Sequence, residues 1–148
     1  MGNTFFHRYD EEFLAFIAAG ELRIPVHAET GLALGLHQRV WCVAGDHGVQ
    51  WRPASGCGAV LSFTVTRRPY TPEFPVPLVH GLIELAEGPR LICRLGGVTP
   101  EAVAVSQVVQ AHFDRQGLVF RPALDGGIKA RQVKLKTKEI SYVGKRLG

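Results

Sequence analysis

Residues 55–68 and 76–105 read almost continuously as the strands and turns of one small β-barrel, and this feature constrains the fold more than any other in the chain. Strict alternation over about four to eight residues is typical of a β-strand with one buried face. In residues 59–66 the predicted buried face carries Leu61, Phe63 and Val65. Residues 67–77, between the two stretches, are rich in proline, which cannot donate a ladder hydrogen bond. That segment is therefore predicted to be a loop.

The same reading of the whole chain predicts five strands, at residues 59–66, 78–85, 90–95, 108–114 and 118–121. A short helix from Thr99 to about Val103 is predicted between the third and fourth strands. Thr99 can cap its first turn, and Pro100 suits the first helical position. A closed sheet of five strands in this order is the OB-type barrel, so we predict an all-β protein.

A helix is predicted ahead of the barrel, from about Tyr9 to Ala19. Its apolar residues fall on one stripe at helical spacing, its first turn is acidic, and Gly20 can end it. The stripe contains Phe13, Leu14, Phe16 and Ile17. Because such a stripe needs a surface to pack on, we expect a docking helix.

The chain is predicted to divide into four parts. Residues 1–20 form the docking helix, 21–53 a small β-rich segment, 54–124 the barrel and 125–148 a basic tail. From Gly126 onward there are seven basic residues and one acidic residue, so the tail carries +6 and the rest of the chain −2 of the net +4. Lysines alternate with Val133, Leu135 and Thr137 in the tail, a pattern that indicates an extended arm.

Several function classes find no support in the sequence. The longest apolar runs fall far short of the roughly 20 residues that span a bilayer, and the acidic start is unlike a signal peptide. We therefore expect a cytoplasmic protein with no membrane contact. The three cysteines have no paired spacing and are expected to be reduced. The six histidines form no metal-binding motif, and no nucleophile elbow is present, so no catalytic residue is predicted.

A resemblance to a known family is carried by Phe120–Pro122 and by the string SGCGAVLSFTVTRRPYTPEFPVPLVHGLIELAEGPRLICRLGGVTPEAVAV. The chain resembles the bacterial and archaeal family of acyl-CoA-associated proteins with an OB-fold and a rubredoxin-like zinc ribbon. The resemblance spans about residues 4–123, and the EGPRL segment at residues 87–91 is its most specific piece. It implies a non-catalytic subunit, assembled with a thiolase-like or related acyl-CoA enzyme. Such a subunit stabilises its partner or helps to hold the acyl-CoA thioester.

The zinc ribbon of that family has lost ligands here. The resemblance implies two Cys-x2-Cys pairs, and the corresponding positions hold His27, Thr30, Cys42 and Gly45. Threonine is a poor zinc ligand and glycine has no side chain to offer, while His37 or His47 would substitute only at spacings that no standard ribbon uses. We therefore expect a degenerate ribbon with no zinc and no other cofactor. Apolar residues would then stabilise the segment, namely Leu32, Leu34, Leu36, Val40 and Trp41.

Six residues are candidates for contact with coenzyme A or with the partner, namely Arg67, Arg68, Tyr70, Lys134, Lys136 and Lys138. Their positive charge could neutralise the phosphates of coenzyme A, dock a protein or simply face solvent. It could also bind nucleic acid, which makes a nucleic-acid-binding OB module the alternative function. A third class is an enzyme that acts alone on a CoA thioester. Apart from its partner, the chain is expected to self-associate through its apolar docking surface.

Overall fold

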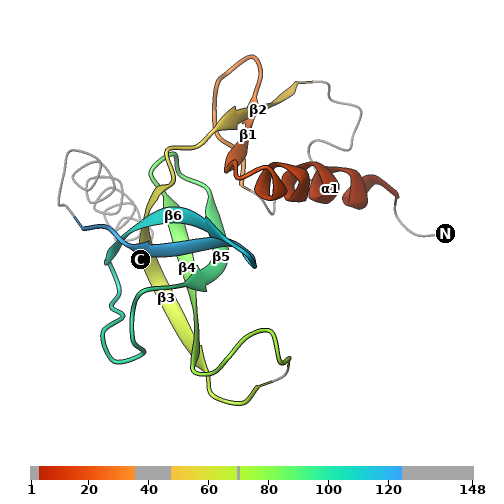
Figure 1. Cartoon of the computed structure of the whole chain (residues 1–148). Coiled ribbons are helices and arrows are strands. Elements are labelled where there is room, and N and C mark those ends of the chain that lie inside the picture. Colours follow the sequence, from red (N-terminus) through yellow and green to blue (C-terminus); the bar gives the residue numbers. More distant parts are fainter. Residues whose placement is uncertain (1–3, 36–47, 70, 125–148) are drawn as a thin grey trace, which may run out of the picture.

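A computed structural model describes residues 4–35, 48–69 and 71–124 of the chain (Figure 1). It begins with helix α1 (Thr4–Ala18), followed by the two-stranded antiparallel sheet of β1 (Arg23–His27) and β2 (Val49–Pro53). Five further strands form a closed barrel in the order β3-β4-β5-β7-β6. They are β3 (Cys57–Thr66), β4 (Leu78–Leu85), β5 (Arg90–Leu95), β6 (Val108–Asp114) and β7 (Gly117–Pro122). The predicted all-β OB-type barrel is confirmed.

Barrel closure depends on β3 and β7. The first residues of β3 pair with β6 while the whole strand pairs with β4, so β3 joins the two ends of the sheet. Strand β7 lies parallel to β5 and antiparallel to β6. Each barrel strand thus has a partner on both sides, which removes the exposed edges that an open sheet would carry.

A β-bulge in β3 corrects one sequence prediction. Phe63 was expected on the buried face, but its side chain is 39% exposed, while Val60 is fully buried. The pairing with β4 shifts register between Val60 and Ser62, so the inward positions change from even to odd numbers along the strand, and Val60 is fully buried while the expected Leu61 is half-buried. Phe63 lies beyond the bulge on the same face as Val65, so the bulge does not account for its exposure. Val65, beyond the bulge, packs against the core as predicted. The centre of that core contains the fully buried Val60, Ile83 and Phe120.

Helix α1 begins five residues earlier than predicted and ends one residue earlier. Gly20 ends it with a φ of 76°, while the Glu21 amide donates to the carbonyl of Phe16 and the Gly20 amide to that of Ile17. Its aromatic face packs on Trp51 of β2, with ring centroids 5.4 Å apart for Phe16. The helix therefore docks on its own chain.

The predicted helix from Thr99 to Val103 is wrong. The segment makes one turn, in which the amides of Ala102 and Val103 both donate to the carbonyl of Thr99. The Ala104 amide then donates to the side chain of Gln107, and Ser106 adopts a φ of 68°, so the helical pattern cannot continue. In the part of the chain that the structure describes, no helix is long and apolar enough to span a membrane.

Candidate functional site at the hinge and on the barrel face

Residues 54–56 form a hinge between the barrel and the head, a name used here for α1, β1 and β2 together. Figure 1 shows the head above the barrel, with the chain passing from β2 into β3. The Ala54 amide donates to the carbonyl of Leu22 at 2.9 Å, so the segment that leaves the helix lies beside the hinge. The two parts of the molecule meet along these two segments and where α1 contacts β7.

Hydrogen bonds from the barrel fasten the hinge. The Ser55 amide donates to Glu87 Oε1 at 2.7 Å, and Gln110 Nε2 donates to the Ser55 carbonyl at 3.1 Å. The Ala111 amide donates to the carbonyl of Gly56 at 2.8 Å. These bonds tie the backbone of the hinge to the barrel, while the bond from the Ala54 amide to the Leu22 carbonyl and the contacts between α1 and β7 position the head.

Gly56 is the point of closest packing in the hinge. Its φ is 76°, a conformation that L side chains rarely adopt. A Cβ atom at this position would lie 2.8 Å from Gln110 Nε2 and 3.0 Å from Ala111 Cβ. The hinge can approach β6 this closely only because residue 56 has no side chain.

The EGPRL segment, which carried most of the resemblance to the family, holds the hinge and β4 in place. Glu87 accepts the Ser55 amide, and Gly88 has a φ of 111° in the turn. Arg90 Nε lies 2.9 Å from Glu84 Oε2, and the Glu84 side chain is only 2% exposed. A buried carboxylate needs such a partner, so this conspicuous motif has a structural role.

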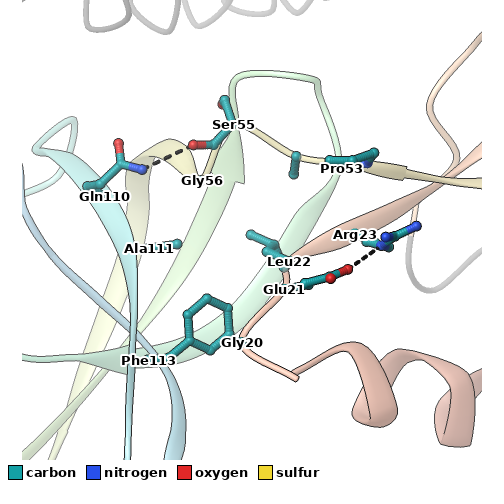
Figure 2. Close-up of a pocket in the computed structure, with 11 residues that line it drawn as sticks. Gly20, Glu21, Leu22, Arg23, Pro53, Ser55, Gly56, Gln110, Ala111 and Phe113 are labelled. Atoms are coloured by element: carbon teal, nitrogen blue, oxygen red, sulfur yellow. Dashed lines mark hydrogen bonds and ion pairs between the residues drawn. The ribbon is translucent and has the colours of Figure 1, made fainter. Parts of the chain in front are cut away.

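An open cavity of about 360 Å³ lies beside the hinge (Figure 2). The head contributes Glu21 and Arg23, which form an ion pair at 2.6 Å, and β6 contributes Gln110 and Phe113 on the other side. Phe113 is 39% exposed. An apolar ring beside charged and amide groups suits a protein side chain entering from a partner.

A second hollow, of about 270 Å³, lies between the outer face of β4 and β5 and the loop of residues 67–77. Arg94 Nη2 lies 2.7 Å from Asp114 Oδ1, and Arg94 Nη1 donates to Gln116 Oε1 at 3.2 Å. The hydrogen bond from Arg94 lowers the pKa of Asp114 below its usual 3.8. The guanidinium also lies 5.6 Å from the ring centroid of Phe74, a residue of the loop.

The structure describes two of the six predicted contact residues. Arg67 and Arg68 are exposed at the start of the 67–77 loop, directly after β3. Tyr70 and the lysines Lys134, Lys136 and Lys138 lie outside the described residues. The contact role of all six stays a prediction. Sequence reasoning missed Arg94, Asp114 and Gln116, although the polar turn after β6 was a signal for a site there.

Two of the four degenerate ligand positions are described. His27 ends β1, and its Nδ1 accepts the Thr30 amide at 3.4 Å. The Thr30 hydroxyl accepts the Leu32 amide at 3.4 Å, so it closes a local turn. Cys42 and Gly45, with His37 and His47, lie outside the described residues, and the expectation that no zinc binds stays a prediction.

Cys93 illustrates the state of a buried thiol in this barrel. Its Sγ donates to the Leu118 carbonyl at 3.3 Å, and burial raises the pKa of the Cys93 thiol to about 11. The thiol is therefore protonated at neutral pH and is a poor nucleophile. Across residues 4–35, 48–69 and 71–124, no three histidine, cysteine or acidic side chains are grouped so as to hold a metal ion.

Sequence and structure comparisons agree on the barrel. Residues 51–114 match the family model of the C-terminal OB-fold domain of ChsH2. A DUF35 domain-containing scaffold protein from Pyrococcus furiosus is 28% identical over 108 residues, which cover 65% of this chain and 79% of that protein. The solved structure of the Ltp2-ChsH2(DUF35) aldolase matches with a TM-score of 0.65 and 26% identity, over 78% of this chain and 94% of that chain.

Two curated relatives are longer proteins. A probable enoyl-CoA hydratase alpha subunit from Thermomonospora curvata is 37% identical over 76 residues, 48% of this chain and 24% of the relative. A 3-oxo-4,17-pregnadiene-20-carboxyl-CoA hydratase alpha subunit from Mycobacterium tuberculosis is 37% identical over 99 residues, 66% of this chain and 31% of the relative. The chain thus spans about a quarter to a third of the length of these two relatives.

Proposed function

Because residues 51–114 belong to the acyl-CoA-associated OB-fold family, we propose that this chain is a cytoplasmic, non-catalytic accessory subunit of an acyl-CoA enzyme of the thiolase type or a related type. Support comes from the relatives, of which two are named as alpha subunits of CoA-thioester hydratases and one as a scaffold protein. A structure named for an aldolase with a DUF35 component points in the same direction.

The fastened hinge is the observation that carries this proposal. Its bonds to Glu87, Gln110 and Ala111 tie it to the barrel, and the bond to the Leu22 carbonyl and the contacts between α1 and β7 hold the head beside it. A partner can then contact both parts without ordering them first, which lowers the entropic cost of association. The cavity beside the hinge, with Phe113 and the Glu21–Arg23 pair at its edges, offers a place for a side chain of the partner.

In this proposal the partner supplies the chemistry. The catalytic nucleophile and the acid–base groups belong to the enzyme, and this chain stabilises the enzyme and helps to hold the CoA thioester. Arg67 and Arg68, exposed beside the barrel, are the described candidates for the CoA phosphates. In this proposal the head binds no zinc, and the packing of Trp51 on the aromatic face of α1 supports it in place of a metal.

Recovery of a partner followed by reconstitution tests the function. The tagged full chain is purified from its native host, the accompanying protein is identified by mass spectrometry, and that protein's acyl-CoA turnover is measured with and without the chain. We expect a stoichiometric complex and higher turnover or stability of the enzyme when the chain is present. A solitary chain that leaves the enzyme unaffected, or that turns over acyl-CoA by itself, would contradict the proposal.

Hinge variants sharpen this test. Gln110→Ala removes one bond to the Ser55 carbonyl and should weaken the complex with the partner several-fold. Gln50→Ala is the matched control, since Gln50 is exposed on β2 and lies away from the hinge. Equal affinities for the two variants would show that the hinge has no part in partner binding.

A further inference from the structure

The hollow beneath the 67–77 loop lies where OB barrels hold their ligands. Strands β4 and β5 are the second and third strands of the barrel, and the 67–77 loop joins the first strand to the second. The turn at residues 114–117 joins the fourth strand to the fifth. In OB-folds, the face of the second and third strands and these two connections bind oligonucleotides and oligosaccharides. All three elements line the hollow of about 270 Å³.

The chain's own loop covers this face. Phe74 lies against Arg94 of β5, with 5.6 Å between the ring centroid and the guanidinium carbon. Gln116, in the turn, donates from Nε2 to the Glu73 carbonyl at 2.5 Å and so ties the loop to the turn. The remaining hollow is smaller than the roughly 300–1,000 Å³ of ordinary small-molecule sites. A ligand can occupy the face fully only if Phe74 leaves it.

The groups beneath the loop have the chemistry of a nucleotide site. A guanidinium that makes a cation–π contact with an aromatic ring can make the same contact with a nucleobase. Bonds to Asp114 and Gln116 hold the Arg94 guanidinium in place, and its side chain is only 15% exposed. Two exposed arginines at the start of the loop, Arg67 and Arg68, provide positive charge for a phosphate.

We propose that the outer face of β4 and β5 is a nucleotide-binding site in which the Phe74 ring lies over Arg94 in the place of a nucleobase. The ligand class is a base with an attached phosphate, whether it comes from a single-stranded nucleic acid or from a free adenosine nucleotide. The site shares Arg67 and Arg68 with the CoA contact in the proposed function, whereas the hinge that carries that function lies on other residues. The hinge variants test the accessory role and the Phe74 and Arg94 variants test this site, so failure of one proposal is distinguishable from failure of the other.

Removal of the Phe74 ring tests the site directly in the full chain. Fluorescence anisotropy follows binding of a labelled twelve-nucleotide oligothymidylate, and calorimetry follows binding of adenosine 3′,5′-bisphosphate, both at low salt. Phe74→Ala should raise the affinity for at least one probe about two- to fivefold, because the ligand no longer displaces a cation–π contact. A gain with the oligonucleotide alone assigns the site to single strands, and a gain with the bisphosphate alone assigns it to free nucleotides.

Three further variants make the result decisive. Phe113→Ala is the matched control, since its ring is also 39% exposed but lies at the hinge cavity, and it should leave both affinities unchanged. Gln116→Ala cuts the tether to Glu73 while keeping the ring, so it tests the loop even if Phe74→Ala does not fold. Adding Arg94→Ala to Phe74→Ala should abolish the gain in affinity for the probe. Unchanged affinities in both Phe74→Ala and Gln116→Ala, or a gain that survives loss of Arg94, would overturn the proposal.

Discussion

In the barrel each strand has a hydrogen-bonded partner on both sides, whereas the head contains one helix and a sheet of two five-residue strands. The barrel core is centred on fully buried side chains such as Ile83 and Phe120. The head buries Ile24 and Val26 of β1 in the same cluster and adds Trp51, which packs against Phe13 and Phe16 and donates to Glu12 Oε2 at 2.8 Å. Two strands and one helix are too few to be stable alone, so the head depends on its attachment to the barrel.

The largest effect is expected in the barrel. Phe120 is fully buried and lies on β7, which closes the sheet, so Phe120→Ala should lower the free energy of unfolding by about 3–5 kcal/mol. Chemical denaturation of the full chain measures it. The head should unfold together with the barrel in this variant. Separate transitions for the two parts would show that the head is stable without the barrel.

A smaller loss is expected at the hinge, where the two parts meet. Gly56→Ala should cost about 2–3 kcal/mol, because the new Cβ overlaps Gln110 in a backbone conformation that already disfavours alanine. The control is Gly31→Ala, at a φ of 70° with open space around it, which should cost about 1 kcal/mol. Thermal melts of the two variants measure the difference, and equal losses would mean that β6 moves away to make room.

The next effect should be confined to the head. Trp51→Phe keeps an aromatic ring but removes the indole donor to Glu12, at a cost of about 1 kcal/mol. Amide hydrogen exchange should become faster in α1 and β2 while β3 to β7 keep their protection. Faster exchange throughout the barrel would show that the two parts unfold as one unit.

The smallest expected effect is on the pH dependence of stability, through Asp114 on the barrel face. The pKa of Asp114 is lowered in the folded state, chiefly by the hydrogen bond from Arg94, so the ionised carboxylate stabilises the fold. This contribution to stability is fully present above the usual pKa of 3.8. It is lost as the pH falls through the lower pKa that Asp114 has in the folded state. Asp114→Asn should therefore flatten the decrease of melting temperature between pH 5 and pH 2. An unchanged slope would show that Asp114 has the same pKa in the folded and unfolded chain.

Alternation alone predicted most of the barrel, since three of its strands have the predicted bounds and the other two differ by only one or two residues at their ends. It failed at Leu61, because a bulge between Val60 and Ser62 makes Val60 the fully buried position without any mark in the sequence. The first turn and a half of α1 was missed because its apolar stripe becomes regular only after Tyr9. The alternation in β3 and the apolar stripe of α1 are both patterns of neighbouring residues. Both predictions failed where packing against other elements overrides such a pattern.

The sites were less predictable than the fold. Arg67 and Arg68 stood out because they are adjacent and charged, yet the contacts on the barrel face come from Arg94, Phe74 and Gln116, which are far apart in sequence. Similarly, Ser55 and Gln110 meet only because β3 and β6 pair at the closure of the barrel. Contacts between residues that are far apart in sequence depend on which strands are neighbours in the barrel. They can be predicted only once that strand order is known.

The place of β7 in the barrel has a consequence for biosynthesis. As the chain emerges from the ribosome, the meander of β3, β4 and β5 forms first, and β6 can join it through β3. Until β7 follows, the outer edges of β5 and β6 have no partner and can recruit strands from other nascent chains. Premature termination shortly before Gly117 should therefore produce aggregated fragments, whereas chains that extend past Pro122 can seal the sheet and stay monodisperse.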